Sequence, residues 1–177
     1  MASAARADAA GGLLAEAAKG SEAAFDELVA PLLEPAFKLA VVMLRDPEEA
    51  RDALQGATFT AWRKLAQVRG EDLFRAWFLT IVANRCRSVI RTRWWTTLRM
   101  PIEAAPAGHA AAGEDLDLRR ELRRLPAPDR AALFLFFYMD LPLDQVGRVL
   151  NVSPKAAKSR VHRAVTKLRL AMQEVTT

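Results

Sequence analysis

The segment between residues 98 and 116 most limits what this chain of 177 residues can fold into. It is rich in Pro, Ala and Gly and carries no apolar stripe at helical spacing, whereas helical patterns fill the chain on both sides. That composition is typical of a linker. We therefore expect an all-α protein of two small helical domains, residues 21–97 and 117–177. A flexible linker would join them over 98–116, and residues 1–20 would form a disordered tail.

Helix start signals mark the first domain. Ser21 precedes one helical stretch, EAAFDELV, and a second stretch runs through EPAFKLAVVML. Asp46 is followed by Pro47 and two glutamates. These are the residue types preferred at the N-cap, the first position and the first turn of a helix. The sequence therefore predicts helices that begin after Ser21 and after Asp46.

Apolar residues at helical spacing predict which faces of the next two helices point inward. The helix after Asp46 has one such stripe, and a fourth helix, from about Glu71 to Arg91, has another. The two stripes are Ala50, Leu54, Ala57, Ala61 and Leu65 in the first, and Leu73, Trp77 and Ile81 in the second.

The other side of the fourth helix carries polar and basic residues at i, i+4, i+7 and i+11, namely Thr80, Asn84, Arg87 and Arg91. Residues 85–99 hold five Arg and no acid. Such a face can follow phosphates, and an asparagine can hydrogen-bond a base edge. Ordinary solvation of the arginines is the alternative. Trp94 and Trp95, which follow, suit either stacking on nucleic acid or packing between domains.

A basic helix is predicted late in the chain. Residues 151–168, NVSPKAAKSRVHRAVTKL, hold five Lys or Arg and no acid, and Ser153 with Pro154 forms an N-cap and first-position pair. One face is apolar, with Ala157, Val161, Ala164 and Leu168. Another carries Lys155, Lys158, Ser159 and His162, with Arg160, Arg163 and Lys167 beside it.

A short helical stretch, DQVGRVL, precedes the basic helix, and only the three residues NVS separate the two. Two short helices joined by a tight turn, with the second basic at its start, are typical of a helix-turn-helix. Gly147 in the middle of the first stretch indicates that another helix approaches closely there. A solvated basic face on a bundle helix is the alternative interpretation.

The composition narrows the remaining classes of function. A net charge of +5 weakly favours a polyanionic partner. The single cysteine, Cys86, excludes an internal disulfide, and with His109 and His162 it makes no metal-ligand spacing. No phosphate-binding glycine loop or catalytic triad motif occurs, so we expect no cofactor and no enzymatic activity. We see no signal peptide and no apolar run of membrane-spanning length, so we expect a cytoplasmic protein.

The second half of the chain resembles region 4 of the extracytoplasmic-function (ECF) group of bacterial sigma factors. The resemblance rests on LPAPDRAALFLFFYMDLPLDQVGRVLNVSPKAAKSRVHRAVTKLR. Its matches are Leu125-Pro126, Arg130, Val146, Leu150, Val152-Ser153, Lys158-Ser159-Arg160 and Arg163-Ala164. Its departures are Gln145, Gly147, Asn151 and Ala156-Ala157, where the family has Glu, Ala, Gly and Thr-Val.

The first half resembles region 2 of the same group. DPEEARDALQGATFTAWRKL is similar to region 2.2, with Asp52, Gln55 and Trp62 at the family spacing and Arg51 in place of the usual Glu. FRAWFLTIVANRCRSVIRTRWW is similar to regions 2.3 and 2.4. The resemblance implies a sigma factor that binds core RNA polymerase and promoter DNA. The alternative is a sigma-like helix-turn-helix regulator that does not support initiation.

The resemblance also implies roles for particular residues and partners. The clamp helices of the largest polymerase subunit would meet Asp52, Leu54, Gln55 and Trp62, although Trp62 suits a core position equally well. The second domain would meet the flap of the second-largest subunit, and a separate anti-sigma factor is a further candidate partner.

Two parts of promoter DNA would be bound. The fourth helix would engage the downstream element through Asn84, Arg85, Arg87 and Arg91, and a loop within residues 68–72 would hold a flipped base. The basic helix would read the upstream element. Lys155, Lys158, Ser159 and His162 would reach base edges, and Arg160 and Arg163 would grip phosphates.

Overall fold

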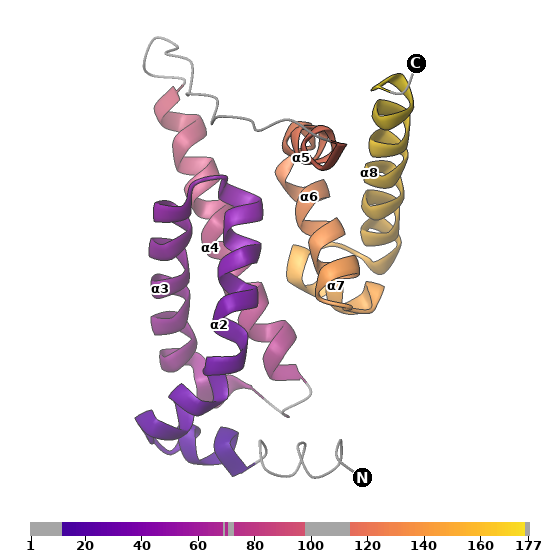
Figure 1. Ribbon diagram of the computed structural model, residues 1–177. Coiled ribbons are helices and arrows are strands. Elements are labelled where there is room, and N and C mark those ends of the chain that lie inside the picture. The colour runs from indigo at the N-terminus through magenta and orange to yellow at the C-terminus, as the bar shows by residue number, and fades with distance from the viewer. Residues whose placement is uncertain (1–11, 69, 71–72, 98–113, 176–177) are drawn as a thin grey trace. The chain divides into compact units, whose positions relative to one another are not determined.

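The computed structural model describes residues 12–68, 70, 73–97 and 114–175, and every regular element among them is helical. This confirms the all-α prediction. The labelled elements in Figure 1 are α2 (Glu22–Leu44), α3 (Pro47–Lys64), α4 (Phe74–Thr97), α5 (Glu114–Arg124), α6 (Ala127–Leu133), α7 (Leu143–Leu150) and α8 (Pro154–Val175). A 3₁₀ turn, η1 (Leu65–Gln67), follows α3, and a π-helical segment, η3 (Phe134–Tyr138), follows α6.

The chain divides into two compact units, Met1–Cys86 and Arg87–Thr177, and the division falls inside α4. Most of the predicted linker, residues 98–113, lies outside the described residues. The domain boundaries proposed from the sequence therefore stay predictions. None of the described helices is long and apolar enough to cross a membrane.

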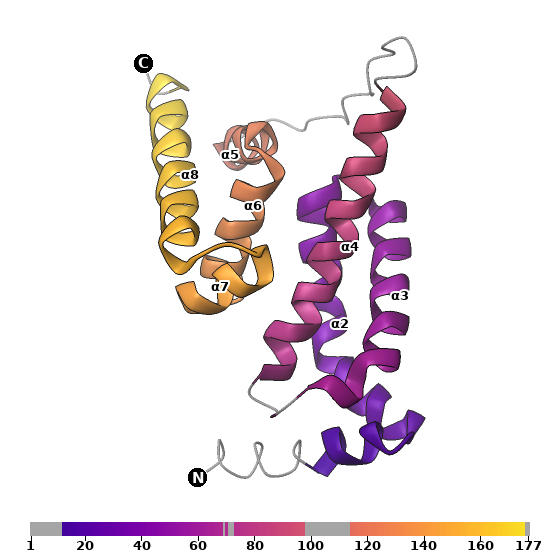
Figure 2. The same cartoon turned by 180° about the vertical axis from the view of Figure 1, so that it is seen from behind.

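In the first unit, α2, α3 and the first half of α4 run alongside one another as a helical bundle (Figures 1 and 2). Small residues of α3 and large residues of α2 and α4 fill its core. The fully or nearly fully buried positions include Leu39, Ala50, Ala57, Ala61, Leu65, Phe78, Leu79, Val82 and Cys86.

The two helical stretches predicted after Ser21 form one continuous helix, α2, although Pro31 and Pro35 lie inside it. Ser21 caps this helix as expected, and its Oγ accepts a hydrogen bond of 3.3 Å from the Ala24 N–H. A proline removes one backbone hydrogen bond and crowds the preceding turn. Buried residues on both sides of the prolines, such as Leu28 and Leu39, stabilise the helix against that cost.

Part of the predicted disordered tail is ordered. Residues 12–18 are helical, and Leu14 and Ala17 are buried. Gly20, with φ of 102°, ends this helix: its N–H donates to the Ala17 carbonyl, and the Ser21 N–H donates to the Glu16 carbonyl. These are the two bonds of a glycine-terminated helix end. The prediction was wrong for this stretch, and residues 1–11 lie outside the described part of the chain.

The inward faces of α3 and α4 are each shifted from the prediction. Ala53 is buried in α3, whereas Leu54 is only half-buried. On α4 the predicted stripe was wrong, because Leu73 is 43% exposed and Trp77 and Ile81 are half-buried. The buried stripe is its neighbour, Phe74, Phe78, Val82 and Cys86 with Leu79 and Ala83. Two apolar stripes overlap in this sequence, and the one that contains both phenylalanines faces the core.

The second unit contains the predicted helix-turn-helix, formed by α7 and α8, and α6 packs against both of these helices. The turn between them is Asn151–Ser153. Asn151 has φ of 54°, its N–H donates to the Arg148 carbonyl, and the Val152 N–H donates to the Gly147 carbonyl at 2.8 Å. The turn is therefore fixed by backbone bonds to the last turn of α7.

Gly147 lies where this turn folds back over α7. A Cβ added at Gly147 would lie 2.7 Å from the Val152 carbonyl oxygen and 3.3 Å from the Pro154 nitrogen. A close approach is thus present, but the sequence prediction of another helix was wrong: the approaching backbone belongs to the turn and to Pro154, the first residue of α8.

We predict that Gly147→Ala destabilises the second unit. Alanine gains about 1 kcal/mol of helix preference. The backbone must open by a few tenths of an ångström to accept the methyl group, and such overpacking costs about 1–3 kcal/mol. Gly56→Ala in α3 is the matched control, because the three atoms nearest to its added Cβ all belong to the flexible Arg85 side chain. Thermal unfolding of both variants measures the effect. A Gly147→Ala protein as stable as the parent would contradict the prediction.

Candidate functional site

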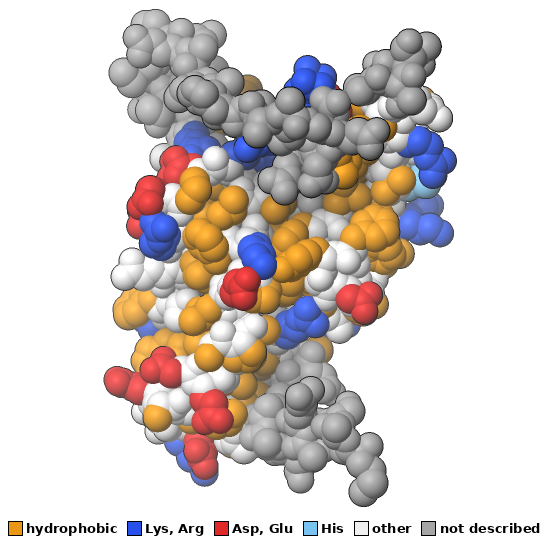
Figure 3. Space-filling model, viewed as in Figure 1, with side chains coloured by type: hydrophobic (Ala, Val, Ile, Leu, Met, Phe, Trp, Pro, Cys, Tyr) orange, Lys and Arg blue, Asp and Glu red, His pale blue; other side chains and the backbone are white. Residues whose placement is uncertain are grey.

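The N-terminal half of α8 presents a polar and basic face. Ser153 caps the helix as predicted, and its Oγ accepts a hydrogen bond of 3.2 Å from the Ala156 N–H. The opposite face is buried at Ala157, Val161 and Ala164. The side chains predicted to reach base edges are all exposed, namely Lys155, Lys158, Ser159 and His162. Figure 3 shows Lys and Arg side chains gathered around a histidine at the edge of α8.

Arg160 and Arg163, the two predicted phosphate contacts on α8, differ in their surroundings. Arg160 is half-buried at the flank of the helix. Arg163 forms a two-pronged ion pair with Asp129 of α6, at 3.0 Å from Nη2 to Oδ1 and 3.3 Å from Nε to Oδ2. Hydrogen bonding to Asp129, and then the charge of its carboxylate, raise the pKa of Arg163 further. Sequence reasoning missed this partner, because Asp129 and Arg163 lie 34 residues apart.

Asn84 and Arg91, two of the predicted DNA contacts, are exposed on α4. Arg87 lies between them along the same line of the helix. Arg85 differs: its guanidinium lies over Gly56 of α3, so that a Cβ added there would be 3.0 Å from Arg85 Nε. Arg85 therefore packs along α3, and its DNA contact stays a prediction.

The sequence did not decide whether Trp94 stacks on nucleic acid or packs between domains. In the structure its side chain is 64% exposed. It follows Arg91 by three residues, which places it on the same side of α4 as Asn84, Arg87 and Arg91. The tryptophan thus extends the basic face by one helical turn. The side chain of Trp95 lies outside the described part of the structure.

The loop expected to hold a flipped base is described only at Val68 and Gly70, and Gly70 has φ of 97°. Arg69, Glu71 and Asp72 lie outside the described residues. The position of this pocket therefore stays a prediction.

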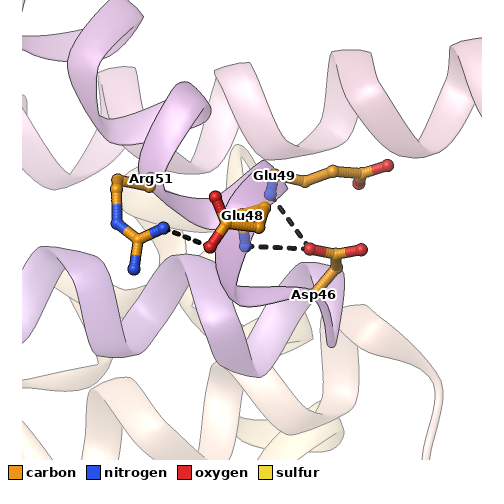
Figure 4. A network of polar contacts seen from close by, with 4 residues as sticks. All are labelled: Asp46, Glu48, Glu49 and Arg51. Atoms are coloured by element: carbon orange, nitrogen blue, oxygen red, sulfur yellow. Dashed lines mark hydrogen bonds and ion pairs between the residues drawn. The ribbon is translucent and has the colours of Figure 1, made fainter.

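The outer face of α3 is a second candidate site. Asp46 caps α3 as predicted, and its Oδ1 accepts hydrogen bonds from the N–H groups of Glu48 at 2.9 Å and Glu49 at 3.1 Å (Figure 4). Arg51, which stands where the family usually has Glu, forms an ion pair with Glu48 (Figure 4). Hydrogen bonding to Glu48, and then the charge of its carboxylate, raise the pKa of Arg51.

Asp52 and Gln55 are exposed on this outer face, as their predicted role requires. Phe59 continues their line one turn further and is 62% exposed, with the Arg63 guanidinium 5.8 Å from its ring centroid. An aromatic ring this exposed is a candidate binding residue that the sequence interpretation did not single out. The signal was its spacing, four residues after Gln55 and seven after Asp52.

Trp62 and Leu54, the other predicted polymerase contacts, are both half-buried. Trp62 packs edge-on against Phe25 of α2, with ring centroids 5.1 Å apart. This contact joins α3 to α2, so Trp62 has a packing role whatever its exposed edge contacts.

Among the residues that the structure describes, no group of three or more His, Cys, Asp or Glu side chains could hold a metal ion. Cys86 is buried in the core of the first unit, and His109 lies outside the described residues.

Comparison with known proteins matches both halves of the chain to one family. Residues 28–96 match the sigma-70 region 2 family, and residues 115–168 match sigma-70 region 4. The chain is 31% identical over 159 residues to the ECF RNA polymerase sigma factor SigM of Mycobacterium tuberculosis, with 88% of this chain and 81% of SigM covered. It is 28% identical to the RNA polymerase sigma factor CarQ of Myxococcus xanthus, over 88% and 93% of the two chains.

Two solved structures share the fold. The sigma factor RpoE of Bartonella quintana, in complex with the anti-sigma factor NepR, aligns with a TM-score of 0.69 and 22% identity over 84% of this chain and 96% of RpoE. CnrH, in complex with the cytosolic domain of CnrY, aligns with a TM-score of 0.69 and 24% identity over 92% and 96%.

The helix-turn-helix of α7 and α8, with its basic face on α8, is typical of a DNA-binding protein. The family matches go further: this chain belongs to the ECF group of RNA polymerase sigma factors, which act in transcription initiation.

We predict that Trp62 and Phe59 differ in their effect on stability. Trp62→Ala removes the ring that packs on Phe25, so the first unit should lose about 2 kcal/mol or more. Phe59→Ala removes a mostly exposed ring and should change stability by less than about 0.5 kcal/mol. Urea unfolding followed by circular dichroism compares them. Equal losses for both variants would mean that the exposed Phe59 ring is a packing residue.

Proposed function

We propose that this chain binds core RNA polymerase through the outer face of α3 and directs it to promoters through α4 and α8. The observation that carries the proposal is the exposure of both faces on one chain. Asp52, Gln55 and Phe59 line α3, and the capped N-terminal half of α8 presents its basic side chains. Such a protein works in the cytoplasm, where bacterial RNA polymerase lies.

The proposed partner of α3 is the pair of clamp helices of the largest subunit. Asp52 and Gln55 offer an acid and an amide to basic and polar groups, and Phe59 offers an apolar anchor between them and Arg63. Interfaces concentrate their binding energy in a few such aromatic residues surrounded by polar ones. Leu54 and the outer edge of Trp62 would lie at the margin of this contact.

The second unit is proposed to contact the flap of the second-largest subunit. Phe137 and Tyr138, at the end of η3, are 64% and 56% exposed and supply an apolar surface for it. The RpoE and CnrH structures contain the anti-sigma factor NepR and the cytosolic domain of CnrY, respectively. A separate anti-sigma factor is therefore a further proposed partner of this chain.

We predict that two changes on α3 weaken polymerase binding without unfolding the protein. The combination Asp52→Lys with Gln55→Ala, and separately Phe59→Ala, should each raise the Kd for core polymerase at least about tenfold. Asp26→Lys, a charge reversal at an exposed site on α2, is the control. A fluorescence titration of labelled protein with core polymerase measures the Kd. Parent affinity in both α3 variants would exclude this face as the contact.

The proposed DNA contacts divide between the two units. The start of α8 would enter the major groove of the upstream (−35) element, with Lys155, Lys158, Ser159 and His162 near base edges. Asn84, Arg87 and Arg91 of α4 would contact the downstream (−10) element while it opens. Trp94 suits stacking on an unpaired base there, because arginines flank it and it is mostly exposed.

We predict that Lys158→Ala changes sequence preference, whereas Lys167→Ala does not. Lys158 lies in the first turns of α8 and should contribute about 1–3 kcal/mol on the preferred duplex. Lys167 is exposed on the same helix but lies more than two turns further from its start. Titrations against the preferred and a scrambled duplex, at several salt concentrations, separate the two effects. Equal losses on both duplexes for Lys158→Ala would make α8 a generic anchor.

The alternative is a sigma-like DNA-binding regulator that does not support initiation. Arg51 is the observation that favours it, because a family acid is replaced by a base next to Asp52. Binding to core polymerase distinguishes the two functions, because the regulator would bind duplex DNA through α8 but would not bind core polymerase.

A further inference from the structure

The ion pair between Asp129 and Arg163 joins α6 to the polar and basic face of α8. Both carboxylate oxygens of Asp129 are engaged, at 3.0 Å and 3.3 Å, by one edge of the guanidinium. The Asp129 side chain is only 5% exposed, whereas the Arg163 side chain is 53% exposed. The acid thus lies inside the unit, and the arginine extends from it into solvent.

The place of Arg163 on α8 makes this arrangement relevant to DNA. It follows Lys155 and Ser159 at intervals of four residues, so it lies at the border of the exposed polar face, on the side of α6. A guanidinium has five N–H donors. The pair with Asp129 uses the Nε–H and one Nη2 hydrogen. The remaining N–H groups, on Nη1 and Nη2, form the side of the guanidinium away from Asp129, which we call its outer edge.

We propose that Asp129 is a positioning residue for DNA binding: it holds the Arg163 guanidinium at the border of the α8 face, with its outer edge directed to a backbone phosphate. The proposal rests on the proposed function of α8 as the DNA-reading helix. An arginine side chain that is already held in place loses less conformational freedom when it binds a phosphate. The bidentate geometry also fixes the plane of the fork, which a single contact would not do.

A competing effect sets the design of the test. Removing the Asp129 charge raises the net positive charge of the unit. The added positive charge by itself strengthens DNA binding, and salt weakens this effect. Asp129→Asn removes this negative charge whether or not Arg163 is present, so its effect through net charge is the same in both backgrounds. A double-mutant cycle therefore separates positioning from net charge.

The experiment compares the parent chain with Asp129→Asn, Arg163→Ala and the double variant. Each full-length protein is titrated with a duplex selected from a randomised pool by the parent chain, near physiological salt. The temperature lies well below the lowest unfolding midpoint, so that all four are folded. Asp129→Asn should weaken binding about three- to tenfold in the parent and should not weaken it in the Arg163→Ala background. It should also lower the salt slope by about one unit, as Arg163→Ala does, an effect that reduced stability alone does not produce.

Arg163→Lys covers the case in which Asp129→Asn fails to fold. It keeps the charge, and it leaves a cation beside the Asp129 carboxylate. An ammonium can donate to the carboxylate and to a phosphate, but it has no rigid fork whose plane the carboxylate could fix. The proposal therefore expects Arg163→Lys to bind DNA more weakly than the parent, and parent affinity for Arg163→Lys would overturn it.

Two results would overturn the proposal in different ways. If Lys158→Ala weakens binding but Asp129→Asn has the same effect in both backgrounds, α8 reads DNA and Asp129 does not position Arg163. If Lys158→Ala and Arg163→Ala both leave binding unchanged, α8 is not the DNA-reading helix. The proposed function of that helix then fails together with the role of Asp129.

Discussion

The second unit depends on how closely the backbone of Val152 approaches Gly147. No side chain beyond hydrogen fits at residue 147 while the Val152 carbonyl lies where it does. The approach allows the Val152 N–H to bond back to the Gly147 carbonyl, and it brings Ser153 to the point where it caps α8. The direction in which α8 leaves the turn is thus set by backbone contacts within a few residues.

A second, long-range contact holds the same helix. The Asp129–Arg163 pair connects α8 to α6 almost three turns after the cap. Between these two fixed points lie Lys155, Lys158 and Ser159, whose side chains are exposed. The cap and the ion pair thus hold the helix that carries these exposed side chains.

In the first unit, α3 has one buried side and one exposed side. Alanines at positions 50, 53, 57 and 61 form the buried side of α3, so the helix lies close against its neighbour. The long side chains of the helix are therefore on the other side, where Asp52, Gln55 and Phe59 are exposed. Trp62 is the exception, because it reaches back to Phe25 of α2.

Local signals in the sequence were sufficient to predict where α2, α3 and α8 begin and to predict the turn before α8. Ser21, Asp46 and Ser153 each cap the helix predicted for them, because capping involves residues within three positions. The inward face of α4 was not predictable in the same way. Two apolar stripes overlap there, and only tertiary packing decides between Trp77 and Phe78.

Contacts between residues far apart in the chain also could not be predicted from the sequence. The partner of Arg163 depends on how α6 crosses α8, and nothing near Asp129 in the sequence points to it. The position of the Arg85 guanidinium over Gly56 likewise depends on the packing of α4 against α3. In both cases an arginine predicted to bind DNA has a structural contact within its own unit.

Run-off transcription from a fragmented genomic library, with core polymerase alone and with this protein added, tests whether the chain makes the polymerase initiate at particular promoters. We expect a small set of transcripts that appear only when the protein is present and that share a two-part upstream sequence. Binding of the protein to DNA without any protein-dependent transcript would exclude this role and favour the regulator that does not support initiation.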